Sequence, residues 1–276
     1  MILSLSTLQQ QLNDSASLLD EITVLILTYN EAPNIRRTLD KLRWAQRVLI
    51  VDSFSTDDTV AIANSFPNVE VLQRRFDSFA RQCNFGLAHI RSEWVLSLDA
   101  DYILSEKLLH DIAHLPVSGT TQGYGARFRY CIWGQPLRRS LYPPRTVLYR
   151  KGRGAYQDDG HGHRVAVSGE IQMLSGWIDH DDRKSLERWL SEQSRYAIGE
   201  TKKLLEAPAT DLNFADRVRL WILPAPFLVF FYTLFVKGLI LDGWPGWYYV
   251  FQRTLAEILL SLRLIETRFK THNRTE

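Results

Sequence analysis

W-V-L-S-L-D-A-D, residues 94–101, is an apolar run that ends in two aspartates separated by one alanine. Its first five residues suit a strand buried in a sheet, whereas Asp99 and Asp101 cannot be buried without partners. We therefore expect both acids at the carboxyl edge of a sheet, where open α/β sheets bind ligands. There they can face one divalent cation, Mg²⁺ or Mn²⁺, which would neutralise a substrate diphosphate. The alternative is that D-A-D merely opens the next helix.

The composition restricts the class of protein. The chain has 276 residues, 45% of them hydrophobic, which allows one large domain or one domain with an appendage. A net charge of +2 does not indicate nucleic acid, so we expect no nucleic-acid partner. Cys83 and Cys131 have no metal-ligand spacing, which predicts neither a disulfide framework nor a zinc site, and favours a reducing compartment. Residues 1–21 lack the features of a secretory signal and are interpreted as a helical lead-in.

Strand patterns alternate with helix patterns over the first 115 residues. Apolar runs short enough for buried strands occupy 22–27, 48–51, 69–72 and 94–98. Helices are expected after Pro33, over 59–65 and over 78–90, and Ser55 and Asp58 have the spacing of a capping box for the second of them. This alternation predicts an α/β protein with a doubly wound, mostly parallel sheet.

Polar side chains follow three of these strands. Neither a G-x-G-x-x-G fingerprint nor a Walker-type lysine loop follows the first strand, so the ligand must be held by side chains. The candidates are Thr28, Asn30 and Glu31 after the first strand, Asp52 after the second, and Asp99 and Asp101 after the fourth. An aspartate in the position of Asp52 can accept hydrogen bonds from a ribose or a base edge. Carboxylates at three strand ends are electrostatically costly unless a ligand or cation lies among them.

Four motifs in this order resemble a family 2 glycosyltransferase of the GT-A fold. They are I-T-V-L-I-L-T-Y-N-E (22–31), V-L-I-V-D-S-F-S-T-D-D-T (48–59), F-A-R-Q-C-N-F-G-L-A (79–88) and the D-A-D strand (94–101). Within that family the chain most resembles the lipopolysaccharide core glucosyltransferase-like subgroup, strongly over 22–115. The resemblance implies a nucleotide-diphosphate sugar as donor, expected to be a UDP-sugar, a divalent metal, and transfer with inversion.

The resemblance also implies roles for the candidate residues. Those expected to hold the nucleoside are Thr28, Asn30, Glu31 and Asp52. Arg81 and Asn84 would lie beside the diphosphate or the donor sugar, while Asp99 and Asp101 would form the metal and ribose site. An arginine fork suits phosphate oxygens, which agrees with the role of Arg81; the alternative for Arg81 is a solvated helix face.

The candidate base lies in the second half, where short strands are expected at 123–133, 146–150, 165–167 and 171–174. Residues 157–164, Q-D-D-G-H-G-H-R, carry two carboxylates, and inverting transfer needs one base for the acceptor proton. We assign Asp159, with Asp158 in reserve; the alternative is a polar turn. Many relatives have a histidine-glutamate pair here, whereas this chain has His163 followed by arginine. His180 is a candidate for a further metal ligand or diphosphate contact, or else a helix cap.

The C-terminal part has a different composition. Residues 220–236 carry no charge, yet seventeen residues are the lower limit for a membrane span, and two prolines favour a re-entrant or in-plane helix. The helix expected over 247–264, after a Gly/Pro-rich turn at 242–246, has an apolar and a polar face. The apolar face carries Phe251, Leu255, Ile258 and Leu262, and the polar face carries Arg253, Glu257 and Ser261. With aromatic residues at its start it is typical of a helix at a membrane interface; a hydrophobic cap or an oligomer contact is the alternative.

The combined hypothesis is an inverting hexosyltransferase of cell-envelope synthesis, held peripherally on the cytoplasmic face of the cell (inner) membrane. It would move a sugar to a glycan, lipid-linked or lipopolysaccharide-type acceptor. The expected parts are a lead-in (1–21), a nucleotide-sugar half (22–115), an acceptor half (116–210) and membrane-associated helices (211–276). Two alternatives are a nucleotidylyltransferase, which would need a Gly-rich basic loop after the first strand, and an inactive membrane module that only binds nucleotide sugars.

Overall fold

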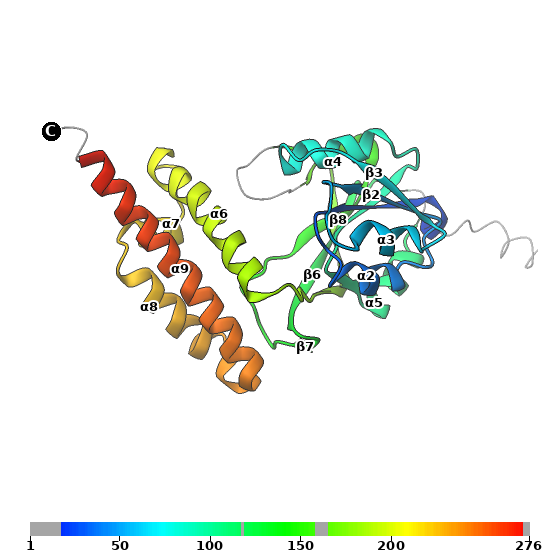
Figure 1. The fold of residues 1–276 in the computed structure, drawn as a ribbon. Helices are drawn as coiled ribbons and strands as arrows, with labels where there is room; N and C mark the ends of the chain where they lie inside the picture. The colour runs from blue at the N-terminus through cyan, green and yellow to red at the C-terminus, as the bar shows by residue number, and fades with distance from the viewer. Residues whose placement is uncertain (1–17, 117–118, 158–164, 273–276) are drawn as a thin grey trace, which may run out of the picture. The chain divides into compact units, whose positions relative to one another are not determined.

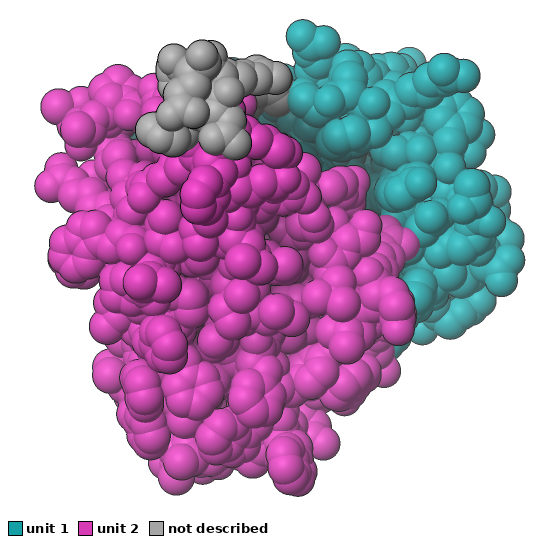
Figure 2. All heavy atoms as spheres, turned by 60° about the vertical axis from the view of Figure 1, so that its left-hand side comes forward, with its two compact units in different colours: residues 1–128, 143–157, 163–179 teal, residues 129–142, 158–162, 180–276 magenta. Residues whose placement is uncertain are grey.

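The computed structural model describes residues 18–116, 119–157 and 165–272. The chain divides into two compact units (Figure 2). Unit 1 comprises residues 1–128, 143–157 and 163–179, and unit 2 comprises residues 129–142, 158–162 and 180–276.

The sheet of unit 1 begins with four parallel strands in the order β3-β2-β1-β4. These strands are β1 (Ile22–Thr28), β2 (Arg47–Asp52), β3 (Val69–Gln73) and β4 (Trp94–Asp99). All four had been predicted from their apolar runs, and the mixed α/β class is confirmed. β1, β2 and β4 are almost wholly buried, which explains why their sequences are continuously apolar rather than alternating.

Beyond β4 the sheet is mixed and continues in the order β8-β6-β11-β5, with β8 antiparallel to both β4 and β6. The bounds are β5 (Tyr102–Leu104), β6 (Gly123–Ile132), β8 (Arg145–Arg150) and β11 (Ile171–His180). Two short strands, β9 (Gly154–Tyr156) and β10 (Val165–Val167), form a separate antiparallel ribbon, and β7 (Gln135–Pro136) pairs with the end of β6. β11 is six residues longer than the predicted 171–174 strand, because Gly176 continues the strand instead of ending it.

The helices of unit 1 are α2 (Ile35–Asp40), α3 (Thr59–Asn64), α4 (Phe79–Ala88) and α5 (Glu106–Ala113), with short 3₁₀ turns η1 (Leu18–Glu21) and η2 (Lys151–Arg153) (Figure 1). Ser78 caps α4 by accepting a hydrogen bond from the Arg81 amide at 3.3 Å. The capping box predicted for α3 is wrong. Asp58 is the N-cap residue but its side chain makes no cap bond, and Ser55 bonds to Asp52 instead.

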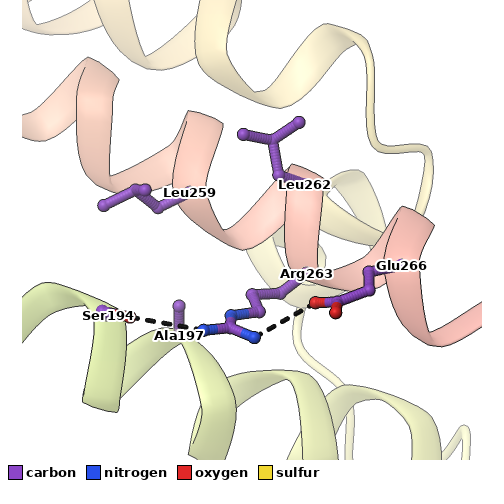
Figure 3. Close-up of a pocket in the computed structure, with 6 residues that line it drawn as sticks. All are labelled: Ser194, Ala197, Leu259, Leu262, Arg263 and Glu266. Atoms are coloured by element: carbon purple, nitrogen blue, oxygen red, sulfur yellow. Dashed lines mark hydrogen bonds and ion pairs between the residues drawn. The ribbon is translucent and has the colours of Figure 1, made fainter.

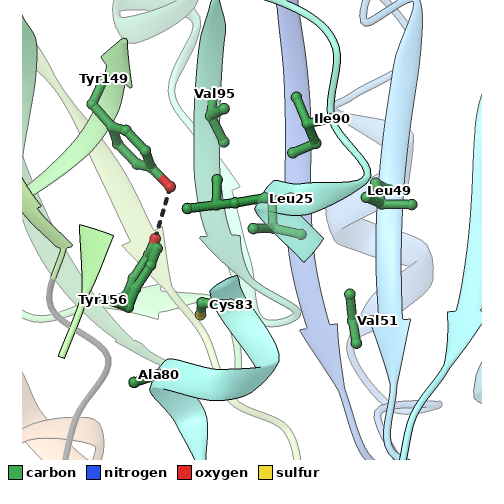
Figure 4. Packing of buried hydrophobic residues seen from close by; sticks show 10 residues of the cluster. Leu25, Leu49, Val51, Ala80, Cys83, Ile90, Val95, Tyr149 and Tyr156 are labelled. Carbon is green, nitrogen blue, oxygen red and sulfur yellow. Dashed lines mark hydrogen bonds between the residues drawn. The ribbon is translucent and has the colours of Figure 1, made fainter. Parts of the chain in front are cut away.

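One hydrophobic core lies between α4 and one face of the parallel strands (Figure 4). Its strand side includes Leu25, Leu49, Val51 and Val95, and its helix side includes Ala80, Cys83 and Leu87. At its margin the hydroxyls of Tyr149 and Tyr156 lie 3.0 Å apart, and the Tyr156 hydroxyl donates to Ser97 Oγ at 2.7 Å. Burial raises the pKa of both phenols, so this chain of hydroxyls stays neutral beneath the carboxyl end of β4.

Unit 2 is mainly helical. It contains α6 (Leu186–Glu206), α7 (Phe214–Leu220), α8 (Pro224–Phe231), the π-helical turn η3 (Tyr232–Val236), the 3₁₀ turn η4 (Leu239–Asp242) and α9 (Gly243–His272) (Figure 1). α9 packs against both α6 and α8. The turn predicted at 242–246 is wrong, because Pro245 lies in the first turn of α9, where its missing N–H leaves no helical bond unmade.

The predicted polar face of α9 is buried, together with Tyr249, Val250, Leu260 and Leu264, whereas the predicted apolar face is exposed. Glu257 is only 3% exposed and accepts hydrogen bonds from the guanidinium of Arg219 in α7 at 2.7, 3.1 and 3.2 Å. Arg219 also forms an ion pair with Glu200 of α6 at 3.2 Å, so charged groups connect three helices. Phe251 and Leu262, by contrast, are 54% and 57% exposed. The predicted division of the helix into two faces is therefore observed, with the hydrophobic one facing outward.

The helices of unit 2 can be judged by the length and hydropathy that a membrane span requires. Within the described part of the chain, no helix qualifies by itself as a span. The segments Pro224–Val236 and Leu239–Lys270, which are bent by 67°, qualify only when they are taken together.

A glycine substitution tests the packing of β11 on α5. A Cβ at Gly176 would overlap the backbone nitrogen and Cα of Leu108, which cannot move as a side chain can. We predict that Gly176→Ala lowers the free energy of unfolding by about 2 kcal/mol, the usual cost of overpacking. Gly152→Ala is the control, because a Cβ there meets no atom within 4 Å. Thermal unfolding followed by circular dichroism measures both; equal midpoints would show that β11 is not packed as described.

Candidate active site

The register of the parallel strands places the predicted site residues along one edge of the sheet. Thr28 is aligned with Asp52 across β1 and β2, and Leu27 is aligned with Asp99 across β1 and β4. Polar groups therefore emerge from three adjacent strands at the same level. This is the carboxyl edge, where the sequence had predicted a ligand site.

Asp52 is fully buried and surrounded by donors. Its Oδ1 accepts hydrogen bonds from the hydroxyls of Thr28 at 2.8 Å and Ser55 at 2.5 Å. Its Oδ2 accepts from the Ser55 amide at 2.8 Å and from the Gln73 side chain at 3.4 Å. The structure thus brings Thr28 and Asp52 together in one network that fixes the ends of β1, β2 and β3. A contact between Asp52 and a nucleoside stays a prediction.

Asn30 and Glu31 hold the loop after β1 against the loop after β2. Asn30 has a φ of 56°, a left-handed conformation that asparagine tolerates. Its side-chain oxygen accepts from the Thr56 amide at 2.7 Å. The Glu31 amide donates to the Thr59 hydroxyl at 2.6 Å, and its carboxylate accepts from the Asn34 side chain at 3.0 Å. Both predicted residues lie at the edge, and these three contacts are made within the protein, so a contact of either residue with the nucleoside stays a prediction.

The D-A-D segment ends β4 and does not open a helix. The three-residue strand β5 follows it, and α5 starts only at Glu106 with Ser105 as its cap. Between the two acids, the buried carbonyl of Ala100 accepts a hydrogen bond from the Thr38 hydroxyl at 2.7 Å. This bond fixes the backbone that carries Asp99 and Asp101, and Asp101 is 7% exposed.

The fit of a metal depends on this pair of carboxylates. No cluster of three or more His, Cys, Asp or Glu side chains suited to a metal occurs among residues 18–116, 119–157 and 165–272. Mg²⁺ is commonly held by one or two carboxylates together with substrate phosphates, so Asp99 and Asp101 fit a cation that arrives with a diphosphate. His180 belongs to unit 2, where its ring contacts Tyr130 and Tyr142 with centroids 4.8 Å apart. Its role as a third ligand stays a prediction.

Arg81 and Asn84, both on α4, differ in how they are engaged. The Arg81 side chain is 70% exposed, and its guanidinium lies 3.7 Å from Asp77. It extends from the first turn of a capped helix, a position that suits an anion. The amide of Asn84 instead donates to the Tyr156 carbonyl at 2.9 Å and accepts from the Tyr156 amide at 3.2 Å. Asn84 therefore connects α4 to β9, and a contact with the donor stays a prediction.

Two aromatic residues at the edge escaped the sequence analysis. Tyr29 follows β1 and Phe54 follows β2, and each is 48% exposed. Phe54 has a φ of 61°, which is unfavourable for a bulky side chain. Because about half of the residue is exposed, core packing does little to offset this strain. The signal that could have revealed them is an aromatic residue directly beside the polar residues at two strand ends.

The assigned base lies elsewhere in the chain. Asp158 and Asp159 fall outside the described residues, so both assignments stay predictions. Tyr156 lies shortly before them in the chain. The Asn84 side chain fixes the backbone of Tyr156 by hydrogen bonds to both its carbonyl and its amide.

Unit 2 contains a cavity of about 340 Å³ between α6 and α9 (Figure 3). Arg263 crosses it, donating to Ser194 at 3.4 Å and to Glu266 at 3.1 Å. Its other lining residues are Ala197, Leu259 and Leu262. Its charged lining residues, Arg263 and Glu266, are paired with each other, which indicates a packing gap between helices rather than a reaction site.

Several known proteins are similar to this chain. The chain is 25% identical over 275 residues to an uncharacterized glycosyltransferase of Rickettsia felis, covering 92% of this chain and 93% of that protein. It is 21% identical to the lipopolysaccharide core biosynthesis glycosyltransferase LpsC of Rhizobium meliloti over 67% and 72% of the two chains. The solved mannosyltransferase PcManGT of Pyrobaculum calidifontis, in complex with GDP-Man and Mn²⁺, is similar at a TM-score of 0.48 and 16% identity, covering 94% of this chain and 93% of that one. The model of glycosyl transferase family 2 matches residues 23–167, more than half of the sequence, and the chain belongs to that family.

Proposed function

We propose that this family 2 glycosyltransferase transfers a sugar, with inversion, from a UDP-sugar to a lipid-linked or lipopolysaccharide-type acceptor at a membrane surface. The observation that carries the proposal is the pair Asp99 and Asp101 at the end of β4, in register with the polar network at the ends of β1 and β2. Carboxylates in that position suit a divalent cation and a diphosphate.

In this proposal the residues at the carboxyl edge of the sheet have distinct roles. Asp99 and Asp101 hold the cation, which, when bound, supplies positive charge to the departing nucleoside diphosphate. Arg81, exposed at the start of α4, turns its guanidinium to the phosphate oxygens. The network of Thr28, Asn30, Glu31 and Asp52 shapes the nucleoside end, and Phe54 offers a face on which the base stacks.

The transfer is a single displacement. The acceptor hydroxyl oxygen forms a bond to the anomeric carbon while the bond from that carbon to the diphosphate oxygen breaks. The hydroxyl proton passes to a carboxylate on the opposite side from the leaving group. We assign this carboxylate to Asp159, with Asp158 in reserve. The electron pair of the broken bond leaves with the diphosphate.

The acceptor side rests on two observations. The relative LpsC is named as a lipopolysaccharide core biosynthesis enzyme, which supports an acceptor of that class. Unit 2 also exposes large apolar side chains along α8 and the turns that follow it: Leu223, Phe227, Phe231, Phe235, Val236 and Leu241 are all more than half exposed. Exposed apolar surface of this extent is typical of an interaction site, and we propose that it contacts the membrane on its cytoplasmic face.

The donor site is tested with the metal. We predict that Asp101→Asn abolishes the Mn²⁺-dependent binding of UDP, measured by calorimetry, because the amide offers the cation a weaker, uncharged ligand. Asp40→Asn is the control, since Asp40 is exposed and paired with Arg43. The same wild-type protein, screened with UDP-sugars for metal-dependent turnover, separates an enzyme from an inactive binding module. Unchanged UDP binding in the Asp101 variant would remove this pair from the mechanism.

The proposed stacking role of Phe54 gives a second prediction. Glycine adopts a φ of 61° without strain, so Phe54→Gly should leave the melting temperature unchanged or raise it. UDP affinity should fall about fivefold or more, because stacking a base on an aromatic ring contributes ~1–3 kcal/mol. Inorganic pyrophosphate with Mn²⁺ is the matched ligand without a base, and its affinity should not change. A fall in stability with unaltered UDP binding would make Phe54 a structural residue.

Membrane contact is tested on the full chain. Phe227 and Phe235 are 66% and 56% exposed, so the double variant Phe227→Glu, Phe235→Glu should fold normally. We expect it to lose at least about tenfold of its affinity for anionic vesicles in a flotation assay, since burying an aromatic side chain contributes ~1.5–3 kcal/mol. Ile171→Glu, at an exposed position of unit 1, is the control. Equal flotation of the double variant and the wild type would refute this contact.

A further inference from the structure

Unit 2 contains a second cavity, of about 370 Å³, which we name the aromatic pocket. The residues that define it are Trp133, Gln135, Trp244, Trp247, Tyr248 and Phe251. They come from the β6–β7 turn and from the first turns of α9. Its volume is in the range of ligand-binding cavities, and no residue of the proposed transfer reaction lines it.

The backbone at Trp133 is strained. Trp133 and Gly134 form the two-residue turn between β6 and β7, with φ values of 48° and 80°. This left-handed pair is the type I′ hairpin turn, which favours asparagine followed by glycine. A tryptophan at the first position is unfavourable, and its side chain remains 61% exposed. The fold therefore gains little from this residue, which points to a role outside packing.

The turn is held firmly in this conformation. The Gly134 amide donates to Oδ1 of Asp181 at 2.9 Å, and Asp181 is only 2% exposed. Arg183 forms an ion pair with the same carboxylate at 2.8 Å. The Trp133 ring then lies against Tyr248, with the ring centroids 4.8 Å apart. One wall of the pocket is thus positioned before any ligand arrives, which lowers the entropic cost of binding.

The lining favours a hydrocarbon over a sugar. Among the described lining residues, Gln135 carries the one side-chain amide, and none carries a charge. The other polar groups of the lining are the indole N–H groups of its tryptophans and the Tyr248 hydroxyl, and none of these described residues supplies a carboxylate to accept hydrogen bonds from the hydroxyls of a sugar ring. The pocket also includes side chains that are exposed themselves, since Trp244 is 84% and Phe251 is 54% exposed. A hydrocarbon chain can therefore enter past these exposed rings.

The segments around the pocket are basic. Residues 133–142 and 237–251 contain Arg138, Arg139 and Lys237 but a single acid, Asp242. Arg138 donates to Asp242 from its amide and from Nε, each at 3.0 Å, which fixes it beside the start of α9 while its side chain stays 64% exposed. Arg139 is exposed and makes no ion pair within the described part of the chain. This charge suits an anionic headgroup next to an apolar chain.

We propose that the aromatic pocket binds the hydrocarbon chain of an anionic membrane lipid, whose phosphate lies against Arg138 and Arg139. The proposal rests on the proposed action at a membrane and deepens it, because it assigns a lipid chain to a defined site in unit 2. The lipid is recognised by an apolar chain and a phosphate together, so that losing the contact with either part weakens binding.

The test uses the purified full-length protein and dodecyl phosphate below its micellar concentration, with binding measured by calorimetry. Trp133→Asn should keep or raise the melting temperature, because asparagine suits the turn, and should weaken dodecyl phosphate binding at least tenfold. Phe269→Ala, which removes an exposed ring near the end of α9, is the control and should bind as the wild type does. Arg139→Ala should weaken binding of dodecyl phosphate but not of dodecyl maltoside.

Several results would overturn the proposal: no binding of dodecyl phosphate, equal binding by the Trp133 variant, or a loss of folding in that variant, which would make Trp133 structural. Binding of maltose or inorganic phosphate alone, with an affinity that depends on Trp133, would identify a sugar or anion site instead. UDP with Mn²⁺ is titrated into the same samples. If UDP binds while dodecyl phosphate does not, the pocket proposal alone fails. If dodecyl phosphate binds while UDP with Mn²⁺ does not, the pocket stands and the proposed sugar transfer fails.

Discussion

Carboxylates at the ends of β2 and β4, the two parallel strands that flank β1, repel one another, and the first unit depends on how that repulsion is offset. At Asp52 the protein supplies the compensation itself, through the hydroxyls of Thr28 and Ser55 and a backbone amide. The same bonds fix the loops after β1 and β2, so the network is both an electrostatic and a structural requirement. At Asp99 and Asp101 the proposed compensation comes from outside, as a cation with its diphosphate.

Each unit also keeps an exposed aromatic side chain on a left-handed backbone, Phe54 in the first and Trp133 in the second. Such conformations persist where the surroundings enforce them, and they are common at binding sites. In the second unit the ion pair between the partly exposed Arg219 and the buried Glu257 has a related effect. It holds the polar face of α9 inward, because separating the pair would leave a buried charge alone at a cost of about 3–5 kcal/mol. The helix face that carries Phe251, Leu255, Ile258 and Leu262 is exposed as a consequence.

The sequence predicted the parallel half of the sheet because buried strands produce continuous apolar runs. The sequence did not predict contacts between residues that are far apart in the chain. Ser55 has the spacing of a helix cap but bonds to Asp52, and Asn84 lies in a donor-site motif but bonds to the backbone 72 residues away. Gly176 resembles a strand break and is instead needed for close packing on α5. The two faces of α9 followed from its periodicity, whereas which one is buried depends on charges carried by α6 and α7.

The central claim is that Asp99 and Asp101 form the metal and diphosphate site. Crystals grown with Mn²⁺ and UDP, measured at the manganese absorption edge, locate the ion directly by its anomalous scattering. We predict one strong peak at coordination distance from at least one of these two carboxylates and from the diphosphate oxygens. A manganese peak bound to UDP at another part of the chain, or UDP bound at this edge with no manganese beside the two aspartates, would contradict the account.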